Sequence, residues 1–179
     1  MEAGATETSD ERLMLAYAGG DAAAFERLYR RHKDALYRYF LRHVEAADAG
    51  ELFQDVWQKL IQARGGYRSD APFAAWLYRI AHNRLVDHWR RARPHDELPA
   101  DAVDADARGP ESQVEQDDTA RRLLAALARL PAEQREIIVL REERNLTLEQ
   151  IADIQGVGRE TVKSRLRYAL AKLREAFHD

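Results

Sequence analysis

The sequence contains no cysteine, so neither a disulfide framework nor a thiolate metal site can form. Its apolar runs are only a few residues long, far shorter than the roughly 20 residues that a membrane-spanning helix needs. The N-terminal stretch MEAGATETSD is polar and acidic and contains no apolar signal core. These absences predict a soluble cytoplasmic protein without membrane insertion.

The net charge is also small, but the charged residues are unevenly distributed along the chain. The formal total of -3 argues, taken alone, against a nucleic-acid partner. Residues 24–94, however, hold 14 Lys and Arg against 8 Asp and Glu, and residues 119–179 hold 12 against 9. Residues 95–118 hold 1 against 9, and residues 1–23 hold 1 against 5. Two basic blocks therefore flank an acidic connector, which the total conceals.

The composition divides the chain into four parts. Residues 1–20 are predicted to be an N-terminal tail. Residues 95–118 are predicted to be an acidic flexible linker, because they hold two of the five prolines and no sustained apolar period. The linker joins two domains, residues 21–94 and residues 119–179, whose apolar residues recur at helical spacing. The sequence therefore predicts an all-α fold of two small helical domains.

Start and stop signals place the individual helices. Asp21 can cap the first helix, Pro72 and Pro94 bracket a later one, and Pro131 suits the first turn of another. No segment has a convincing strand pattern. The bounded helices are expected at 47–63, 73–93, 119–130 and 159–176, with others after Asp21, Pro131 and Thr147.

The stretch LTLEQIADIQGVGRETVKSRL is typical of a helix-turn-helix, in which the second helix enters the major groove of DNA. Thr147 and Gln150 form a capping-box pattern, and Gly156 can take the positive φ that the turn needs. Val162, Leu166, Ala169, Leu170 and Leu173 are expected on the buried face of the second helix, and Glu160, Lys163, Ser164, Arg167 and Tyr168 on the opposite face. The alternative is a helical hairpin with a solvated basic face.

The helix over residues 73–93 mixes basic and aromatic residues. Arg79, Asn83 and Arg90 form one outward stripe at helical spacing, and Trp76, Tyr78, His88 and Trp89 lie among the arginines. Such a mixture suits single-stranded DNA, because the charges follow the backbone and the rings stack on unpaired bases. The alternative is that the aromatic rings belong to the core.

A polar stripe lies on the preceding helix. Glu51, Gln54, Asp55 and Gln58 recur at helical spacing opposite an apolar face. This stripe is either an ordinary solvated surface or a docking face for a basic partner.

Several stretches together resemble a bacterial extracytoplasmic-function (ECF) sigma factor, the smallest type of sigma-70 family initiation subunit. They are AGELFQDVWQKL, YRSDAPFAAWLYRIAHNRLVDHWRR, the acidic connector, and LARLPAEQREIIVLREERNLTLEQIADIQGVGRETVKSRLRYALAKLRE. The resemblance extends over about residues 24–176 in the order and spacing of the family. It implies a sigma-2 domain at 21–94 and a sigma-4 domain at 119–179.

The resemblance also implies roles for particular residues. Four would dock on the β′ clamp helices of RNA polymerase: Glu51, Gln54, Asp55 and Gln58. The residues that would recognise and melt the −10 element are Tyr67, Arg68, Ser69, Trp76, Arg79, Asn83, Arg84, His88, Trp89, Arg90 and Arg91. Those that would read the −35 element are Arg159, Glu160, Thr161, Lys163, Ser164, Arg165, Arg167 and Tyr168.

The partners implied are core RNA polymerase, including its β flap, promoter DNA and an anti-sigma factor. The chain is expected to be a monomer when free of them. No catalytic residue, metal or other cofactor is expected.

Three positions depart from the family pattern. Asp is usual where this chain has Glu51, and Phe is common where it has Trp57. Gln155 stands where the family buries a Leu between the two helices of the motif. Its side chain is therefore expected either to extend outward or to loosen the packing of the turn.

Two other classes of protein compete with this interpretation. An autonomous helix-turn-helix regulator would usually dimerise, but no dimer interface is evident and residues 24–94 would have no role. An enzyme is disfavoured because the six histidines are scattered and no metal-ligand, nucleotide-loop or nucleophile motif is found.

Overall fold

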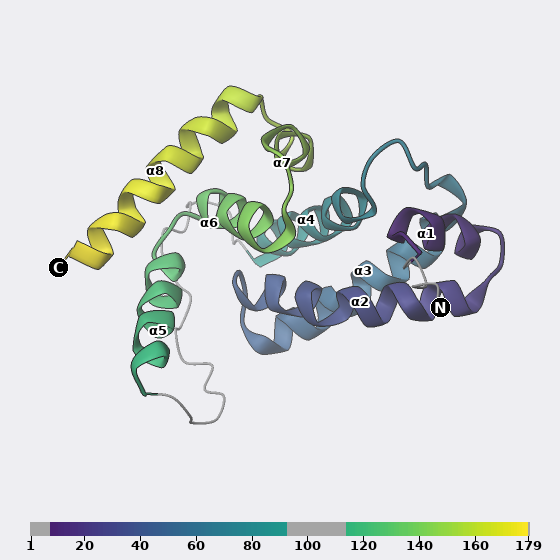
Figure 1. Ribbon diagram of the computed structural model, residues 1–179, viewed down its shortest axis with the longest axis horizontal. Coiled ribbons are helices and arrows are strands. Elements are labelled where there is room, and N and C mark those ends of the chain that lie inside the picture. The colour runs from purple at the N-terminus through teal and green to yellow at the C-terminus, as the bar shows by residue number, and fades with distance from the viewer. Residues whose placement is uncertain (1–7, 93–113, 179) are drawn as a thin grey trace, which may run out of the picture.

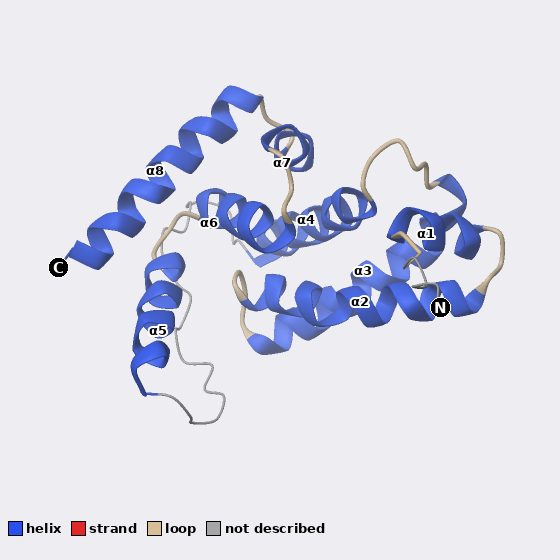
Figure 2. Cartoon of the chain, in the orientation of Figure 1, coloured by secondary structure: helices blue, strands red, loops and turns tan. Residues whose placement is uncertain are grey.

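The computed structural model describes residues 8–92 and 114–178, and all regular structure in these residues is helical (Figures 1 and 2). The predicted all-α fold class is confirmed. The helices are α1 (Asp10–Ala18), α2 (Ala22–Leu41), α3 (Ala46–Ala63), α4 (Phe73–Ala92), α5 (Val114–Ala128), α6 (Ala132–Ile138), α7 (Leu148–Gln155) and α8 (Arg159–His178). A 3-10 turn, η1 (Arg64–Gly66), follows α3, and a π-helical turn, η2 (Val139–Glu143), follows α6.

Helices α1 to α4 form the first half of the molecule. Asp21 caps α2 as predicted, since its Oδ1 accepts hydrogen bonds from the backbone N–H groups of Ala23 and Ala24 at 2.9 and 3.2 Å. Each of α2, α3 and α4 buries one apolar face, with Leu36, Leu60 and Leu77 fully enclosed. Helix α4 therefore presents its other face outward from a packed support.

The prediction of a tail over residues 1–20 is wrong for its second half. Ser9 caps α1 by accepting a hydrogen bond from the backbone N–H of Arg12, and Leu13 and Met14 of α1 are buried in the core. Met14 is fully enclosed, which for a side chain of this size contributes about 1.5–3 kcal/mol relative to exposure. Residues 1–7 lie outside the described part of the chain.

Two acidic residues tie α1 to the rest of the first half. Asp10 lies 2.6 Å from both Arg31 Nη1 and His32 Nε2 on α2. Burial tends to raise the pKa of Asp10, but the hydrogen bonds and charges of His32 and Arg31 hold it below its usual value. Glu11 Oε1 accepts a hydrogen bond from the backbone N–H of Phe73 at 2.9 Å, so α1 caps the start of α4.

Helices α5 to α8 form the second half. Helix α5 begins at Val114 rather than at the expected residue 119, so the predicted linker is wrong for residues 114–118. The rest of the predicted linker, residues 95–113, lies outside the described residues. Leu127 of α5 and Leu130, which follows the helix, pack with Ile138 and Ala169 in a small apolar cluster of their own.

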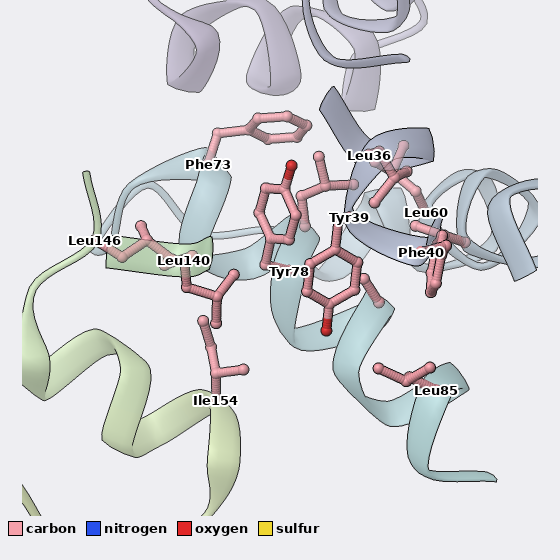
Figure 3. Packing of buried hydrophobic residues seen from close by; sticks show 14 of the residues in the cluster. Leu36, Tyr39, Phe40, Leu60, Phe73, Tyr78, Leu85, Leu140, Leu146 and Ile154 are labelled. Atoms are coloured by element: carbon pink, nitrogen blue, oxygen red, sulfur yellow. The ribbon is translucent and has the colours of Figure 1, made fainter. Parts of the chain in front are cut away.

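The two halves share one hydrophobic core. Leu140, Leu146 and Ile154 of the second half belong to the same buried cluster as Phe73 and Tyr78 of α4. Figure 3 shows these side chains meeting across the junction, where α7 packs against α4. The two domains expected from the sequence are therefore packed against each other.

Arg135 of α6 is a buried cation within this junction. Its guanidinium donates hydrogen bonds to four backbone carbonyls, three near the end of α5 and one after α2. The acceptors are Leu127 O at 2.9 Å, Ala128 O at 2.7 Å, Leu130 O at 2.9 Å and Arg42 O at 2.8 Å. One side chain thus supplies donors to carbonyl groups at two helix ends, where intrahelical partners are lacking, although Leu127 O also accepts from the backbone N–H of Leu130.

Candidate nucleic-acid interface

The outward stripe predicted on α4 is present. Arg79, Asn83 and Arg90 are exposed, while Leu77 and Leu85 on the opposite side are fully buried. The stripe therefore lies on a rigid helix, held at its start by Glu11 and along its length by the core. Three long polar side chains on one helical face are suited to following a nucleic-acid strand.

Other predicted −10 residues have partners within the protein. Arg84 Nη2 donates to Asp87 Oδ2 at 2.7 Å, and His88 Nε2 lies 3.5 Å from Asp48 Oδ2 on α3. Arg91 is exposed on the last turn of α4. Binding of a strand by Arg84 or His88 would therefore compete with an existing ion pair.

The aromatic residues are less available than the sequence suggested. Tyr67 is only 6% exposed, and its ring lies 5.0 Å from that of Trp76, between the centroids, in an edge-to-face contact. Trp76 and Trp89 are partly buried against the core, whereas Arg68 and Ser69 are exposed. Tyr78, one of the rings considered for stacking on unpaired bases, is fully buried, and the −10 role of the largely covered Tyr67 stays a prediction.

Helices α7 and α8 form the predicted helix-turn-helix. Thr147 Oγ1 accepts from the backbone N–H of Gln150 at 3.2 Å, and Gln150 Oε1 accepts from the N–H of Thr147 at 2.9 Å, which completes the capping box. Gly156 has φ 66 and ends α7 in the left-handed conformation. Val162 is fully buried and anchors α8.

Gly156→Ala is expected to lower the free energy of unfolding by about 1 kcal/mol, because a Cβ disfavours the left-handed conformation. Open space surrounds the position, so no clash adds to this cost. Gly158→Ala is the matched control, since Gly158 also has open space but no positive φ. Urea denaturation of both variants measures the difference, and equal midpoints would contradict the conformational explanation.

The outer face of α8 carries the predicted −35 residues. Most of them are exposed: Arg159, Glu160, Thr161, Lys163, Arg167 and Tyr168, with Ser164 and Arg165 partly buried. The Arg167 guanidinium lies 5.6 Å from the centre of the Tyr168 ring, and Lys163 Nζ lies 2.9 Å from Glu160 Oε1. Leu170, expected on the buried face, is 37% exposed, because α5 and α6 cover only Leu166, Ala169 and Leu173 on that side.

Gln155 takes neither of the two expected positions. Its Nε2 donates to Glu136 Oε2 at 2.9 Å and to Glu133 O at 3.1 Å, and its Oε1 accepts from Arg165 at 3.0 Å. The amide is therefore held by hydrogen bonds at the turn, and the neighbouring Ile154 remains buried.

The predicted docking stripe lies on the exposed side of α3. Glu51, Gln54, Asp55 and Gln58 are all exposed, opposite the buried Leu52, Val56 and Leu60. Within the part of the chain that the structure describes, none of the four side chains takes part in an ion pair. The stripe thus offers free carboxylates to a basic partner.

Comparisons with known proteins agree with these observations. Residues 28–95 match the family described as Sigma-70 region 2, and residues 126–175 match Sigma-70, region 4. The ECF RNA polymerase sigma factor SigM of Mycobacterium tuberculosis (strain ATCC 25618 / H37Rv) is 36% identical over 171 residues, which cover 95% of this chain and 85% of the relative. The ECF sigma factor SigL of the same organism is 35% identical, covering 88% of this chain and 90% of the relative.

The chain belongs to the ECF sigma factors of the sigma-70 family. It is an alternative sigma factor, a protein that directs transcription initiation by RNA polymerase.

Solved structures share the fold of this sigma factor. CnrH, solved in complex with the cytosolic domain of CnrY, superposes with a TM-score of 0.70 at 24% identity, covering 96% of this chain and 98% of CnrH. RpoE of Bartonella quintana, solved in complex with the anti-sigma factor NepR, has a TM-score of 0.66 at 22% identity and covers 86% of this chain. None of the described helices of the sigma factor is both long and apolar enough to cross a membrane.

The α4 stripe of the sigma factor faces one side of the helix-turn-helix across a groove of about 920 Å³. Arg79, Asn83 and Arg90 of α4 line one side, and Asp153 and Arg165 of the helix-turn-helix line the other. No local pattern in the sequence predicts this arrangement or the buried residues that hold it, because the partners are far apart along the chain.

Proposed function

We propose that this sigma factor binds the −10 element with α4 and the loop before it, reads the −35 element with α8, and docks on core polymerase through α3. The main support is the geometry of α7, Gly156 and α8, since a capped short helix, a left-handed glycine and an exposed basic helix form a major-groove reader. The docking stripe and the α4 stripe would act at separate surfaces of the first half.

The −35 element would be recognised from the first turns of α8. Lys163 and Arg167 are exposed one turn apart, and long donors at such positions can reach base edges in the major groove. Arg159 is also exposed and pairs with Glu149 of α7, so it is placed to contact phosphate and fix orientation.

The −10 element would be held as a separated strand. Arg79 and Arg90 offer charge to the backbone, and Asn83 between them offers both a donor and an acceptor to a base edge. The exposed Arg68 and Ser69 lie in the loop that leads into α4 and would contact the neighbouring nucleotides.

The chemistry would belong to the polymerase, so we propose a non-catalytic role for the sigma factor. Its partners would be the β′ clamp helices, the β flap and promoter DNA, and its place of action the cytoplasm, at the nucleoid within the holoenzyme. RpoE of Bartonella quintana was solved with an anti-sigma factor, and a protein of that class is the expected regulator here.

Transcription in vitro tests the proposal as a whole. Core polymerase and a pool of promoter fragments from the source genome are incubated with and without the protein. Specific transcripts that require both proteins are expected, and their start sites would define the −35 and −10 sequences. Tight sequence-specific DNA binding by the protein alone, without any transcript, would instead indicate an autonomous regulator.

Arg167→Ala is expected to reduce discrimination between the correct and a changed −35 base by roughly ten- to a hundredfold, the effect of one lost bidentate contact of about 1–3 kcal/mol. Run-off transcription from matched and mutated promoters measures the ratio. Arg174→Ala removes an exposed arginine two turns further along α8 and serves as the control. An equal loss in both variants would show that α8 contributes only charge.

Reversing charge at Glu51 and Asp55 to lysine is expected to weaken binding to core polymerase by at least about tenfold, because like charges would face a basic docking partner. A titration of labelled protein with core enzyme measures the affinity. Lysine at Asp34 and Glu142, two exposed carboxylates elsewhere, makes the same change in net charge. If both double variants bind alike, α3 is not the docking face.

A further inference from the structure

A buried polar cluster lies where the two halves meet. At its centre is the carboxylate of Glu136 on α6, which is 1% exposed. Tyr39 Oη of α2 donates to its Oε1 at 2.5 Å, His82 Nδ1 of α4 lies 2.9 and 3.1 Å from the two oxygens, and Gln155 Nε2 donates to Oε2 at 2.9 Å. We call Tyr39, His82, Glu136 and Gln155 the Glu136 latch.

The latch joins the halves through a charge. Burial acts to raise the pKa of Glu136, but the hydrogen bonds and charge of His82, together with Tyr39, hold it below its ordinary value, so the group is a carboxylate. Two of its three side-chain donors come from the first half of the molecule. A buried carboxylate requires such donors, and only one register of the two halves supplies them.

Apolar contacts lie beside the latch, which borders the groove through His82, Glu136 and Gln155. Ile154 and Leu140 of the second half pack in the same cluster as Tyr78 and Phe73 of α4 (Figure 3). These contacts supply attraction without direction, whereas the hydrogen bonds of the latch select one orientation. The junction is thus an interface with one defined orientation rather than a non-directional apolar contact.

The closed arrangement makes the exposed α4 stripe one side of a groove. The groove that contains Arg79, Asn83 and Arg90 also contains Glu133 and Asp153 from the second half. A DNA strand on the stripe would therefore meet carboxylates of the same sign as its phosphates within a groove already bounded by α7.

We propose that this sigma factor, when free, is held closed by the Glu136 latch and must open before α4 can take up a DNA strand. Closure needs no second protein, since every donor to Glu136 belongs to this chain. Gln155, which departs from the family pattern, contributes to closure. Its amide donates a hydrogen bond to Glu136 and accepts one from Arg165 of α8. The statement about α4 rests on the proposed function, whereas the closure itself does not.

Distance measurements on the free protein test closure directly. The absence of cysteine allows spin labels at two introduced cysteines, at the exposed Gln62 of α3 and Lys172 of α8, with no background labelling. Pulsed electron paramagnetic resonance is expected to give one narrow distance distribution for the parent chain. In Tyr39→Phe and in Gln155→Leu a longer, broad population is expected, with the ratio of open to closed molecules raised about tenfold or more.

Tyr39→Phe keeps the aromatic ring, and Gln155→Leu keeps a side chain of similar size. Circular dichroism is therefore expected to show that the helices remain folded. Tyr37→Phe removes the same hydroxyl two residues earlier on α2, outside the latch, and is expected to leave the distribution unchanged. A broad distribution in the parent chain, or identical distributions in parent and latch variants, would overturn the closed state.

A binding measurement tests what closure covers. The probe is a fluorescent single strand carrying the non-template −10 region of a promoter found by transcription, titrated in the absence of polymerase. Tyr39→Phe and Gln155→Leu are expected to bind it about tenfold more tightly than the parent chain, and adding Asn83→Ala is expected to cancel the gain.

The outcomes of the two measurements are distinguishable. Opening without any gain in affinity would overturn the claim that closure covers the DNA-binding face. A gain that survives Asn83→Ala would overturn the assignment of that face to α4, while the distance data would still decide whether the latch closes the chain.

Discussion

Arg135→Leu is expected to lower the free energy of unfolding by about 3–5 kcal/mol, more than any other single substitution considered for this protein. Leucine keeps most of the apolar volume but removes the guanidinium from four backbone carbonyls, of which Leu127 O keeps the backbone N–H of Leu130 as a donor. Burial already lowers the pKa of Arg135, yet the group stays charged because arginine does not lose its proton in proteins. Urea denaturation at pH 7 measures the loss.

Two further variants separate geometry from charge. Arg135→Lys keeps the charge but cannot reach four acceptors in a planar fork, so it is expected to recover less than half of the loss. Arg141→Leu removes an exposed arginine from η2, whose ion pair with Glu142 is 3.6 Å long, and is expected to change stability by less than about 0.5 kcal/mol. If Arg135→Leu and Arg141→Leu unfold at the same urea concentration, Arg135 does not hold the helix ends.

The second large effect is a loss of stability in acid. His43 is 4% exposed, and within the described part of the chain neither ring nitrogen has a hydrogen-bond partner. Burial lowers its pKa from 6.5 to about 4, although the charge of Glu136 acts in the opposite direction. Below pH 6.5 the unfolded chain therefore binds a proton at His43, whereas the folded chain does not bind it until the pH falls to about 4.

The sign of the effect follows from this difference. Stability is retained above pH 6.5 and falls as the pH drops toward 4, by about 3 kcal/mol from this one side chain. The groups that face His43 are Tyr39 and Arg42 beside it in sequence, His82 and Trp89 of α4, and Arg135 and Glu136 of α6. The lowered pKa of Glu136 adds a loss in the same direction, at more acidic pH.

His43→Phe isolates the contribution of His43. Phenylalanine can keep the ring contacts with Tyr39 and Trp89, whose centroids lie 5.0 and 6.1 Å from that of His43. The variant is expected to match or exceed the parent in stability at pH 7 and to lose much less between pH 6.5 and 4.5. Parallel stability curves for the two proteins over this range would refute the assignment.

Local signals in the sequence predict most of the helices. Asp21, Thr147 with Gln150, and Gly156 each act within four residues of themselves, and each has the predicted role in the structure. Exposure of the α3 and α4 stripes was predictable for the same reason, since a helical period assigns opposite faces without knowledge of the partner. Helix α1 was missed because its apolar stretch is short and lies among acidic residues.

The junction between the halves could not be predicted in this way. Tyr39 and Glu136 are 97 positions apart, and His82 and Glu136 are 54 apart. Taken singly, Glu136 looks like an ordinary solvated residue on a short helix, and Tyr39 like a member of the core. Only the fold brings the hydroxyl and the carboxylate together. The family pattern predicted that Gln155 extends outward or loosens the turn, whereas its amide is held by hydrogen bonds to Glu133, Glu136 and Arg165.

Helix α1 has a consequence for exchanging modules between sigma factors. The match to Sigma-70 region 2 begins at Leu28, inside α2, yet the folded first half includes α1 with its cap at Ser9. A chimera joined at the recognisable boundary would remove Leu13 and Met14 from the core and the Glu11 acceptor from the first turn of α4. Swapped modules would keep their fold, and with it their promoter preference, only if the graft carries these preceding residues, so the limit of the region 2 match is not the limit of the folded unit.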